Sequence, residues 1–149
     1  MKIAVATAVS LLIVSLHVIS GPGTPGENTY VRFSATLKHG SQAGRPAGAL
    51  LFNLRPRKGI HVNLDPPISV TFDSTAPAKA AGKLEVPRME KLPYLDTSKA
   101  IIQRFTLRRQ SKPAPVTLKG VLTYFYCSDA EGWCSKFKQP FAVTVPVTQ

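Results

Sequence analysis

The sequence has few of the residues from which metal and catalytic sites are usually built. Its 149 positions hold two cysteines, three histidines and eight Asp or Glu residues. The histidines, His17, His39 and His61, show no metal-ligand spacing, and two cysteines supply only half of a zinc site. We therefore expect no metal site, and nothing in the sequence points to a bound cofactor.

The common catalytic motifs are missing as well. The chain has no Gly-x-Ser-x-Gly nucleophile elbow and no phosphate-binding glycine loop. Its carboxylates are scattered, so no pair can be assigned the roles of general acid and general base. His61 lies in a strand-like segment, and we interpret it as a core or edge residue rather than a base. The cysteines are therefore the one remaining candidate for chemistry.

Long apolar runs are missing except at the start of the chain. Lys2 precedes the largely apolar stretch from Ile3 to Ile19, and Val18-Ile19-Ser20 before Gly21 suits cleavage by a signal peptidase. This predicts a secretory signal peptide at residues 1–20. A retained anchor is the alternative, since the run is just short of the ~20 residues that span a bilayer. Either way we expect a periplasmic or otherwise exported protein, where disulfides persist.

Acidic residues are scarce relative to basic ones. Nineteen Lys and Arg residues against eight Asp and Glu give a net charge of +11. Such an excess favours polyanions, negatively charged membrane surfaces or acidic proteins as partners. The basic residues are dispersed along the chain, so a solvated basic surface is the simpler interpretation. Because export is expected, we do not expect nucleic acid as a ligand, and no small-molecule substrate is evident.

The pattern of the remaining chain is that of an all-β protein. Thirteen prolines and ten glycines argue against long helices, whereas several segments alternate apolar and polar residues with period two. Strands are expected at residues 30–37, 49–54, 60–63, 68–72, 83–86, 101–107, 116–126 and 141–145, with polar loops at 38–48 and 76–82 and an irregular segment at 87–98. We predict a flexible Gly/Pro linker at 21–28 and one antiparallel, immunoglobulin-like β-sandwich at 29–149, with a closed barrel as the alternative.

Six residues separate the two cysteines, Cys127 and Cys134. In an exported protein this spacing predicts a disulfide that closes a β-hairpin. As a purely structural bridge it would contribute on the order of 2–3 kcal/mol on the chain-entropy model. Asp129 and Glu131 place negative charge beside the sulfurs and disfavour a thiolate. The bond is therefore better suited to attack by a partner's thiolate than to supplying an attacking thiolate itself.

The surroundings of the cysteines resemble a known family. Thr123-Tyr124 before Cys127, and the Cys-x-Asp to Gly-aromatic-Cys loop that follows, look like the amino-terminal periplasmic domain of the thiol:disulfide interchange protein DsbD. The segment Gly59 to Asn63, followed by Pro66-Pro67, is similar to one in DsbD-like exported domains. Together these segments cover most of residues 50–147, although only the cysteine loop is a motif.

The resemblance implies an immunoglobulin-like fold and a redox-active pair, Cys127 and Cys134, with Cys134 favoured as the attacked sulfur. In that family an aromatic residue on a loop shields the pair. By position Tyr94, within Glu90 to Asp96, is its counterpart here. Trp133 and Tyr126 are the other residues expected to shield the pair or to dock a partner.

The resemblance also implies the partners. Family members accept electrons from a thioredoxin-like domain and pass them to oxidised periplasmic proteins. This chain has one residue more between its cysteines than the family pattern, and no electron-carrying domain follows them before Gln149. A thioredoxin-like or membrane-embedded carrier is therefore expected to act as a separate protein. The alternative is a non-enzymatic binding module that docks a partner through its basic face or Trp133, with a purely structural disulfide.

Overall fold

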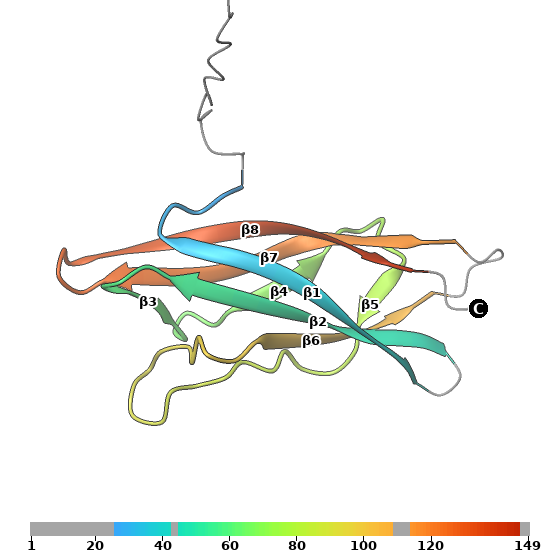
Figure 1. The fold of residues 1–149 in the computed structure, drawn as a ribbon, viewed down its shortest axis with the longest axis horizontal. Helices are drawn as coiled ribbons and strands as arrows, with labels where there is room; N and C mark the ends of the chain where they lie inside the picture. The colour runs from blue at the N-terminus through green and yellow to red at the C-terminus, as the bar shows by residue number, and fades with distance from the viewer. Residues whose placement is uncertain (1–25, 43–44, 109–113, 147–149) are drawn as a thin grey trace, which may run out of the picture.

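The computed structural model describes residues 26–42, 45–108 and 114–146. The signal peptide expected at residues 1–20 and most of the linker expected at 21–28 lie outside these ranges. Within them the chain forms eight strands and no helix, and every strand pair is antiparallel (Figure 1). The all-β prediction is confirmed. In this part of the chain no helix has the length and apolar character needed to cross a membrane.

The strands form two sheets that face each other as a β-sandwich. One sheet has the order β1-β2-β6-β5; in the other, β7 pairs with β8 along one edge and with β3 and β4 along the opposite edge. The strand bounds are β1 Val31–Gln42, β2 Arg45–Pro56, β3 Ile60–Asn63, β4 Ser69–Phe72, β5 Ala78–Ala80, β6 Ile101–Leu107, β7 Val116–Ser128 and β8 Trp133–Val145. β7 is thus the central strand of its sheet, as its long apolar stretch predicts.

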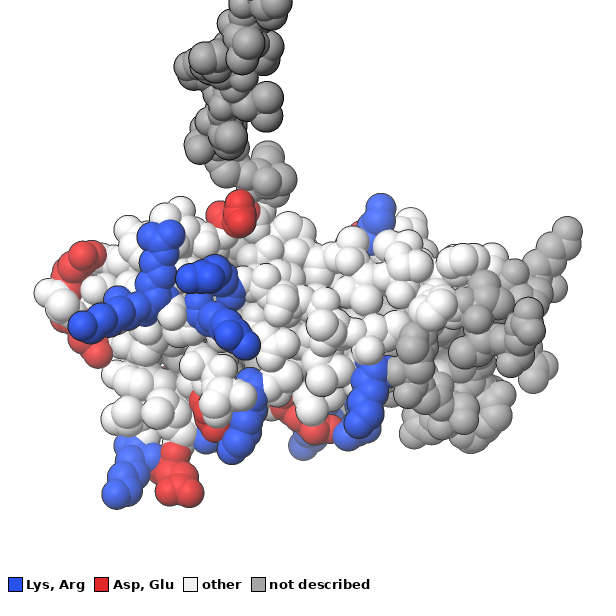
Figure 2. Space-filling view, in the orientation of Figure 1, with Lys and Arg blue, Asp and Glu red and all other residues white. Residues whose placement is uncertain are grey.

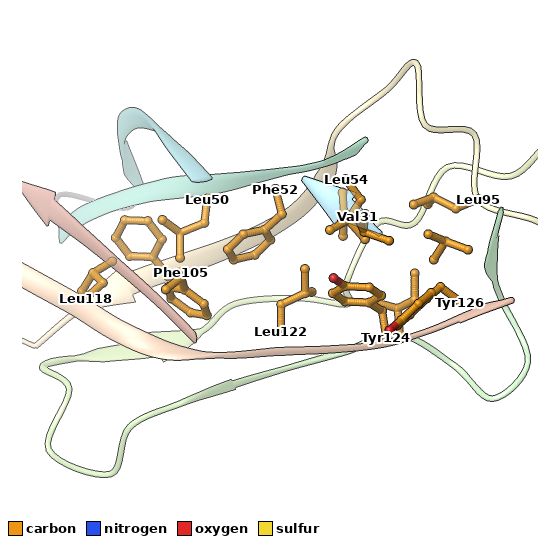
Figure 3. Close-up of a cluster of buried hydrophobic side chains, with 14 of the residues drawn as sticks. Val31, Leu50, Phe52, Leu54, Leu95, Phe105, Leu118, Leu122, Tyr124 and Tyr126 are labelled. Carbon is orange, nitrogen blue, oxygen red and sulfur yellow. The ribbon is translucent and has the colours of Figure 1, made fainter. Parts of the chain in front are cut away.

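The hydrophobic core lies between the two sheets. Leu122 and Tyr124 of β7 are fully buried and point toward Leu50 and Phe52 of β2 (Figure 3). Successive side chains of a strand point to opposite faces of the sheet. The residues of β7 that alternate with these core residues, Cys127 among them, therefore lie on the outer face of the sandwich.

The first hairpin is longer than the sequence pattern predicts. We expected a polar loop at residues 38–48, but β1 and β2 pair along their whole length through this region. Gly48 contributes to the difference, because a Cβ atom there would lie 2.8 Å from the Lys38 carbonyl oxygen and 2.9 Å from the Phe105 ring. The close packing that this glycine permits is a tertiary contact, which the local apolar pattern does not contain.

Three further differences between the expected and the observed strands each exceed two residues. Residues 83–86 form a single bridge, between Glu85 and Ile102, instead of a strand. The short strand β5 lies in the expected loop at 76–82, where pairing with β6 holds it. β8 begins at Trp133 rather than at residue 141. Pro140 is accommodated within it because β8 is an edge strand among the described residues, where the missing N–H need not face a neighbour.

Charged side chains are spread over the surface. On the face shown in Figure 2, Lys and Arg side chains lie in several separate places, with one group toward the end that carries the β7–β8 turn. Acidic side chains lie at the tip of the same end. The hairpin that carries the cysteines therefore combines both signs of charge.

Candidate functional site

A disulfide joins Cys127 to Cys134 beside the turn of the β7–β8 hairpin. The two residues are direct partners in the strand register, and their Cα atoms lie 4.1 Å apart. This is the close spacing of a non-hydrogen-bonded pair of antiparallel residues. The predicted disulfide on a hairpin is therefore confirmed.

The local sequence of the turn sets this register. The loop runs from Asp129 to Gly132 between the paired residues Ser128 and Trp133. Gly132 has φ of +69°, a left-handed conformation that glycine adopts without a side-chain penalty. Its N–H donates to the Ser128 carbonyl at 2.9 Å, and that closes the turn. With the turn fixed in this way, the two cysteines must lie opposite each other.

Cys127 is buried although it lies on the outer face of the sheet. Its exposed fraction is 3%. The cover comes from β3, which pairs with this end of β7, and from the segment Pro93–Leu95 beyond it. This segment is bonded to the free edge of β3: Leu64 donates its N–H to the Pro93 carbonyl at 3.2 Å, and Leu95 to the Val62 carbonyl at 2.9 Å.

Tyr94 is placed over the site by these backbone bonds. It forms a bridge with Asn63, so both side chains lie on the outer face of the sheet with Cys127. The Tyr94 ring stacks on the His61 ring, with 3.9 Å between centroids. Tyr94 lines the same cavity as both cysteines. The structure thus brings together Tyr94 and the cysteine pair, which the sequence separates by more than thirty positions.

His61 belongs to the site, a position that the sequence interpretation did not give it. It lies directly opposite Cys127 in the β3–β7 register. Its Nδ1 atom is 3.4 Å from Asp129 Oδ2 in the hairpin turn, and its side chain is only 16% exposed. The imidazole is therefore held between the Tyr94 ring and the Asp129 carboxylate.

Asn63 is the second site residue that sequence reasoning missed. Its Nδ2 donates a hydrogen bond of 2.9 Å to Cys127 Sγ. The alternation of Ile60-His61-Val62-Asn63 does place His61 and Asn63 on one face of a strand, and this polar face was the available signal. The alternation does not say which strand lies beside residues 60–63. The site is formed because these residues pair with β7.

An open cavity of about 500 Å³ lies over this end of the sheet. Both cysteines line it, and Cys134 is an exposed residue on the edge strand β8, whereas Cys127 is covered. Asp65 and Asp129 give its wall negative charge. Lys136 lies two residues beyond Cys134 on the same face of β8, with its Nζ atom 5.7 Å from the Phe125 ring centroid. The surroundings of the bond therefore include both carboxylates and a cation.

Trp133 and Tyr126 lie largely on the core side of the hairpin. Trp133 is half-buried and packs edge-on against Tyr126 and Tyr30, with centroid distances of 5.7 and 5.0 Å. Its indole N–H donates to the Glu131 carboxylate, and one part of it reaches the cavity. Tyr126 is buried in the core cluster. Of the three predicted shielding or docking residues, Tyr94 and Trp133 line the cavity that contains the cysteines. Tyr126 packs against Trp133 from the core side.

Among the described residues, no group of three or more His, Cys, Asp or Glu side chains is arranged to hold a metal ion.

Comparison with known proteins adds no assignment, because no family model, no curated protein and no solved structure matches this chain.

Proposed function

We propose that this chain is an exported thiol–disulfide exchange domain whose Cys127–Cys134 bond accepts electrons from a partner's thiols. We further propose that its sandwich is an immunoglobulin-like fold of the DsbD amino-terminal type and that it works in the periplasm. The support for this assignment is the cysteine loop, the two-sheet antiparallel architecture and the placement of Tyr94 beside the pair.

The observation that carries the proposal is the different surroundings of the two sulfurs. A thiolate attacks one sulfur of a disulfide and displaces the other, and it approaches along the extension of the S–S bond. The bond crosses from β7 to β8. Attack on Cys127 would require approach from the β3 side, where His61 and Tyr94 lie. Attack on Cys134 comes from beyond β8, which pairs with no strand other than β7 among the described residues.

This arrangement suits a bond that receives attack from a protein. Cys134 is exposed on an edge strand, beside an open cavity of about 500 Å³. A separate thioredoxin-like or membrane-embedded carrier would supply the electrons, and oxidised exported proteins would receive them.

A purely structural disulfide in a binding module is the second candidate. The observation that favours it is the direct pairing of the two cysteines beside a tight turn, where a bridge secures a hairpin. Such a bridge would contribute about 2–3 kcal/mol.

The reduction potential of the bond separates the two functions. Equilibration of the full-length chain with dithiothreitol buffers, followed by thiol labelling, gives this value. We expect a potential above roughly −300 mV, within reach of thiol partners. A value below roughly −300 mV would place the bond with structural disulfides and contradict the exchange function.

A further inference from the structure

A hydrogen bond reaches the Cys127 sulfur atom from outside the hairpin. Asn63 Nδ2 lies 2.9 Å from Cys127 Sγ, although 64 positions separate the two residues in the chain. The backbone of Asn63 is held by β7 on one side and by Tyr94 on the other. Asn63 is therefore fixed in place at both edges of its strand, and its amide is positioned before any reaction takes place.

The strength of this hydrogen bond increases when the disulfide is reduced. A disulfide sulfur is a weak acceptor, so the contact contributes little to the oxidised state. A thiolate carries a full negative charge, and hydrogen bonds to charged groups are roughly twice as strong as neutral ones. Because Cys127 is almost completely buried, a thiolate there receives little stabilisation from water. The amide of Asn63 would then be a side-chain donor already within hydrogen-bond distance.

We propose that Asn63 stabilises Cys127 as the leaving thiolate and thereby directs attack to Cys134. This inference rests on the exchange function proposed above. It adds the residue that decides which sulfur is displaced.

The exchange is a two-electron transfer in two steps. A partner thiolate forms a bond to Cys134 Sγ, the Cys127–Cys134 bond breaks, and its electron pair remains on Cys127 Sγ, where Asn63 donates its hydrogen bond. The partner's second thiolate then attacks the partner sulfur of the mixed disulfide and displaces Cys134 as a thiolate. The partner dithiol has lost two electrons and two protons, and the two cysteines take up protons from solvent.

A second polar side chain that faces Cys127, that of His61, is engaged elsewhere. His61 is opposite Cys127 in the register, but its Nδ1 lies 3.4 Å from the Asp129 carboxylate and its ring stacks on Tyr94. The hydrogen bond to the sulfur comes from Asn63.

Three substitutions in the full-length chain test the proposal. Asn63→Ala removes the donor, and Asn63→Asp keeps the size of the side chain but replaces the donor by a carboxylate. Asn53→Ala, at a half-buried position of β2 in the other sheet, is the matched control. The first readout is the rate at which dithiothreitol reduces the disulfide. The second is the ionisation of the Cys127 thiol in a Cys134→Ser background, followed by thiolate absorbance.

We expect Asn63→Ala to slow reduction and to lower the fraction of Cys127 thiolate by roughly tenfold near neutral pH, with a larger loss in Asn63→Asp. Asn53→Ala should change neither quantity. If Asn63 only packed against its neighbours, Asn63→Asp would have the same rate of reduction and the same fraction of Cys127 thiolate as the unchanged chain. That result would overturn the proposal. Unchanged Cys127 ionisation in Asn63→Ala would overturn it too. The ionisation readout needs no exchange reaction, so it decides the role of Asn63 even if the unchanged disulfide resists dithiothreitol and the exchange function fails.

Discussion

Asn28 Nδ2 donates a hydrogen bond of 2.9 Å to the hydroxyl of Tyr124, a residue 96 positions later in the chain. Both residues are buried, and the Asn28 Oδ1 atom accepts from the Tyr30 and Val31 backbone N–H groups. This asparagine therefore ties the entry into β1 to the central strand β7, at the end of the core that lies beneath the disulfide hairpin.

The buried Tyr124 hydroxyl should make the protein sensitive to alkaline pH. Burial raises the pKa of Tyr124 to about 12 from 10.0, against an opposing effect of the Asn28 hydrogen bond. The stability that this neutral phenol contributes is fully present below pH 10 and is lost as pH rises toward 12. We expect the free energy of unfolding to fall by roughly 3 kcal/mol more in the unchanged chain than in Tyr124→Phe over this range. Denaturant titrations across this pH range measure the free energy of unfolding, with Tyr30→Phe as the control. An equal loss in Tyr124→Phe would contradict the prediction.

The two single-cysteine variants should differ in reactivity. In Cys127→Ser the remaining Cys134 lies exposed on the edge strand, whereas in Cys134→Ser the remaining Cys127 is covered. We expect Cys134 to react with an aromatic disulfide reagent at least roughly tenfold faster, and to be the residue that traps a mixed disulfide with a thioredoxin-like partner. Stopped-flow absorbance gives both rates. Faster labelling of Cys127 would reverse the proposed direction of attack.

Removal of the Tyr94 ring should open the covered side of the disulfide. Tyr94→Ala exposes the approach to Cys127 past His61, so we expect dithiothreitol to reduce the bond several-fold faster. Leu92→Ala is the matched control, because Leu92 is an exposed residue on the same loop and does not line the cavity. Equal rates for Tyr94→Ala and the unchanged chain would show that Tyr94 does not shield the pair.

Gly120 should tolerate no side chain. A Cβ atom there would lie 2.3 Å from the Thr71 carbonyl oxygen and 2.7 Å from the Phe141 ring. We expect Gly120→Ala to lower the free energy of unfolding by about 3 kcal/mol or more, because the contacted backbone cannot move without opening β4 from β7. Gly59→Ala is the comparison: its φ is +80° but nothing lies within 4 Å, so only backbone strain of about 1 kcal/mol applies. Denaturant unfolding measures both. Similar losses would contradict the packing argument.

Strands with a clear period of two were predictable from the sequence. Residues 60–63 and 101–107 match β3 and β6, and the expected strand at 68–72 differs from β4 by one residue. The pattern failed where pairing, rather than burial, makes the strand. The far end of the first hairpin is extended by its partner strands, and β5 is held by β6 alone.

The same distinction explains which residues of the site could be predicted from the sequence. Cys127 and Cys134 are close in sequence, so their disulfide and hairpin could be predicted from spacing and composition. Asn63 and His61 reach the site only through the register between β3 and β7. Register depends on which strands become neighbours, and a single strand pattern carries no information about that choice.

Backbone pairing between β7 and β8 continues on both sides of the disulfide, from Val116–Val145 to Ser128–Trp133. Breaking the S–S bond therefore releases neither strand, and the two thiols of the reduced chain remain face to face. Reoxidation is then an intramolecular closure with little chain entropy left to lose. We expect spectra that depend on the backbone conformation to be the same for the oxidised and the reduced chain. Only a probe of the sulfur atoms themselves would then report the oxidation state.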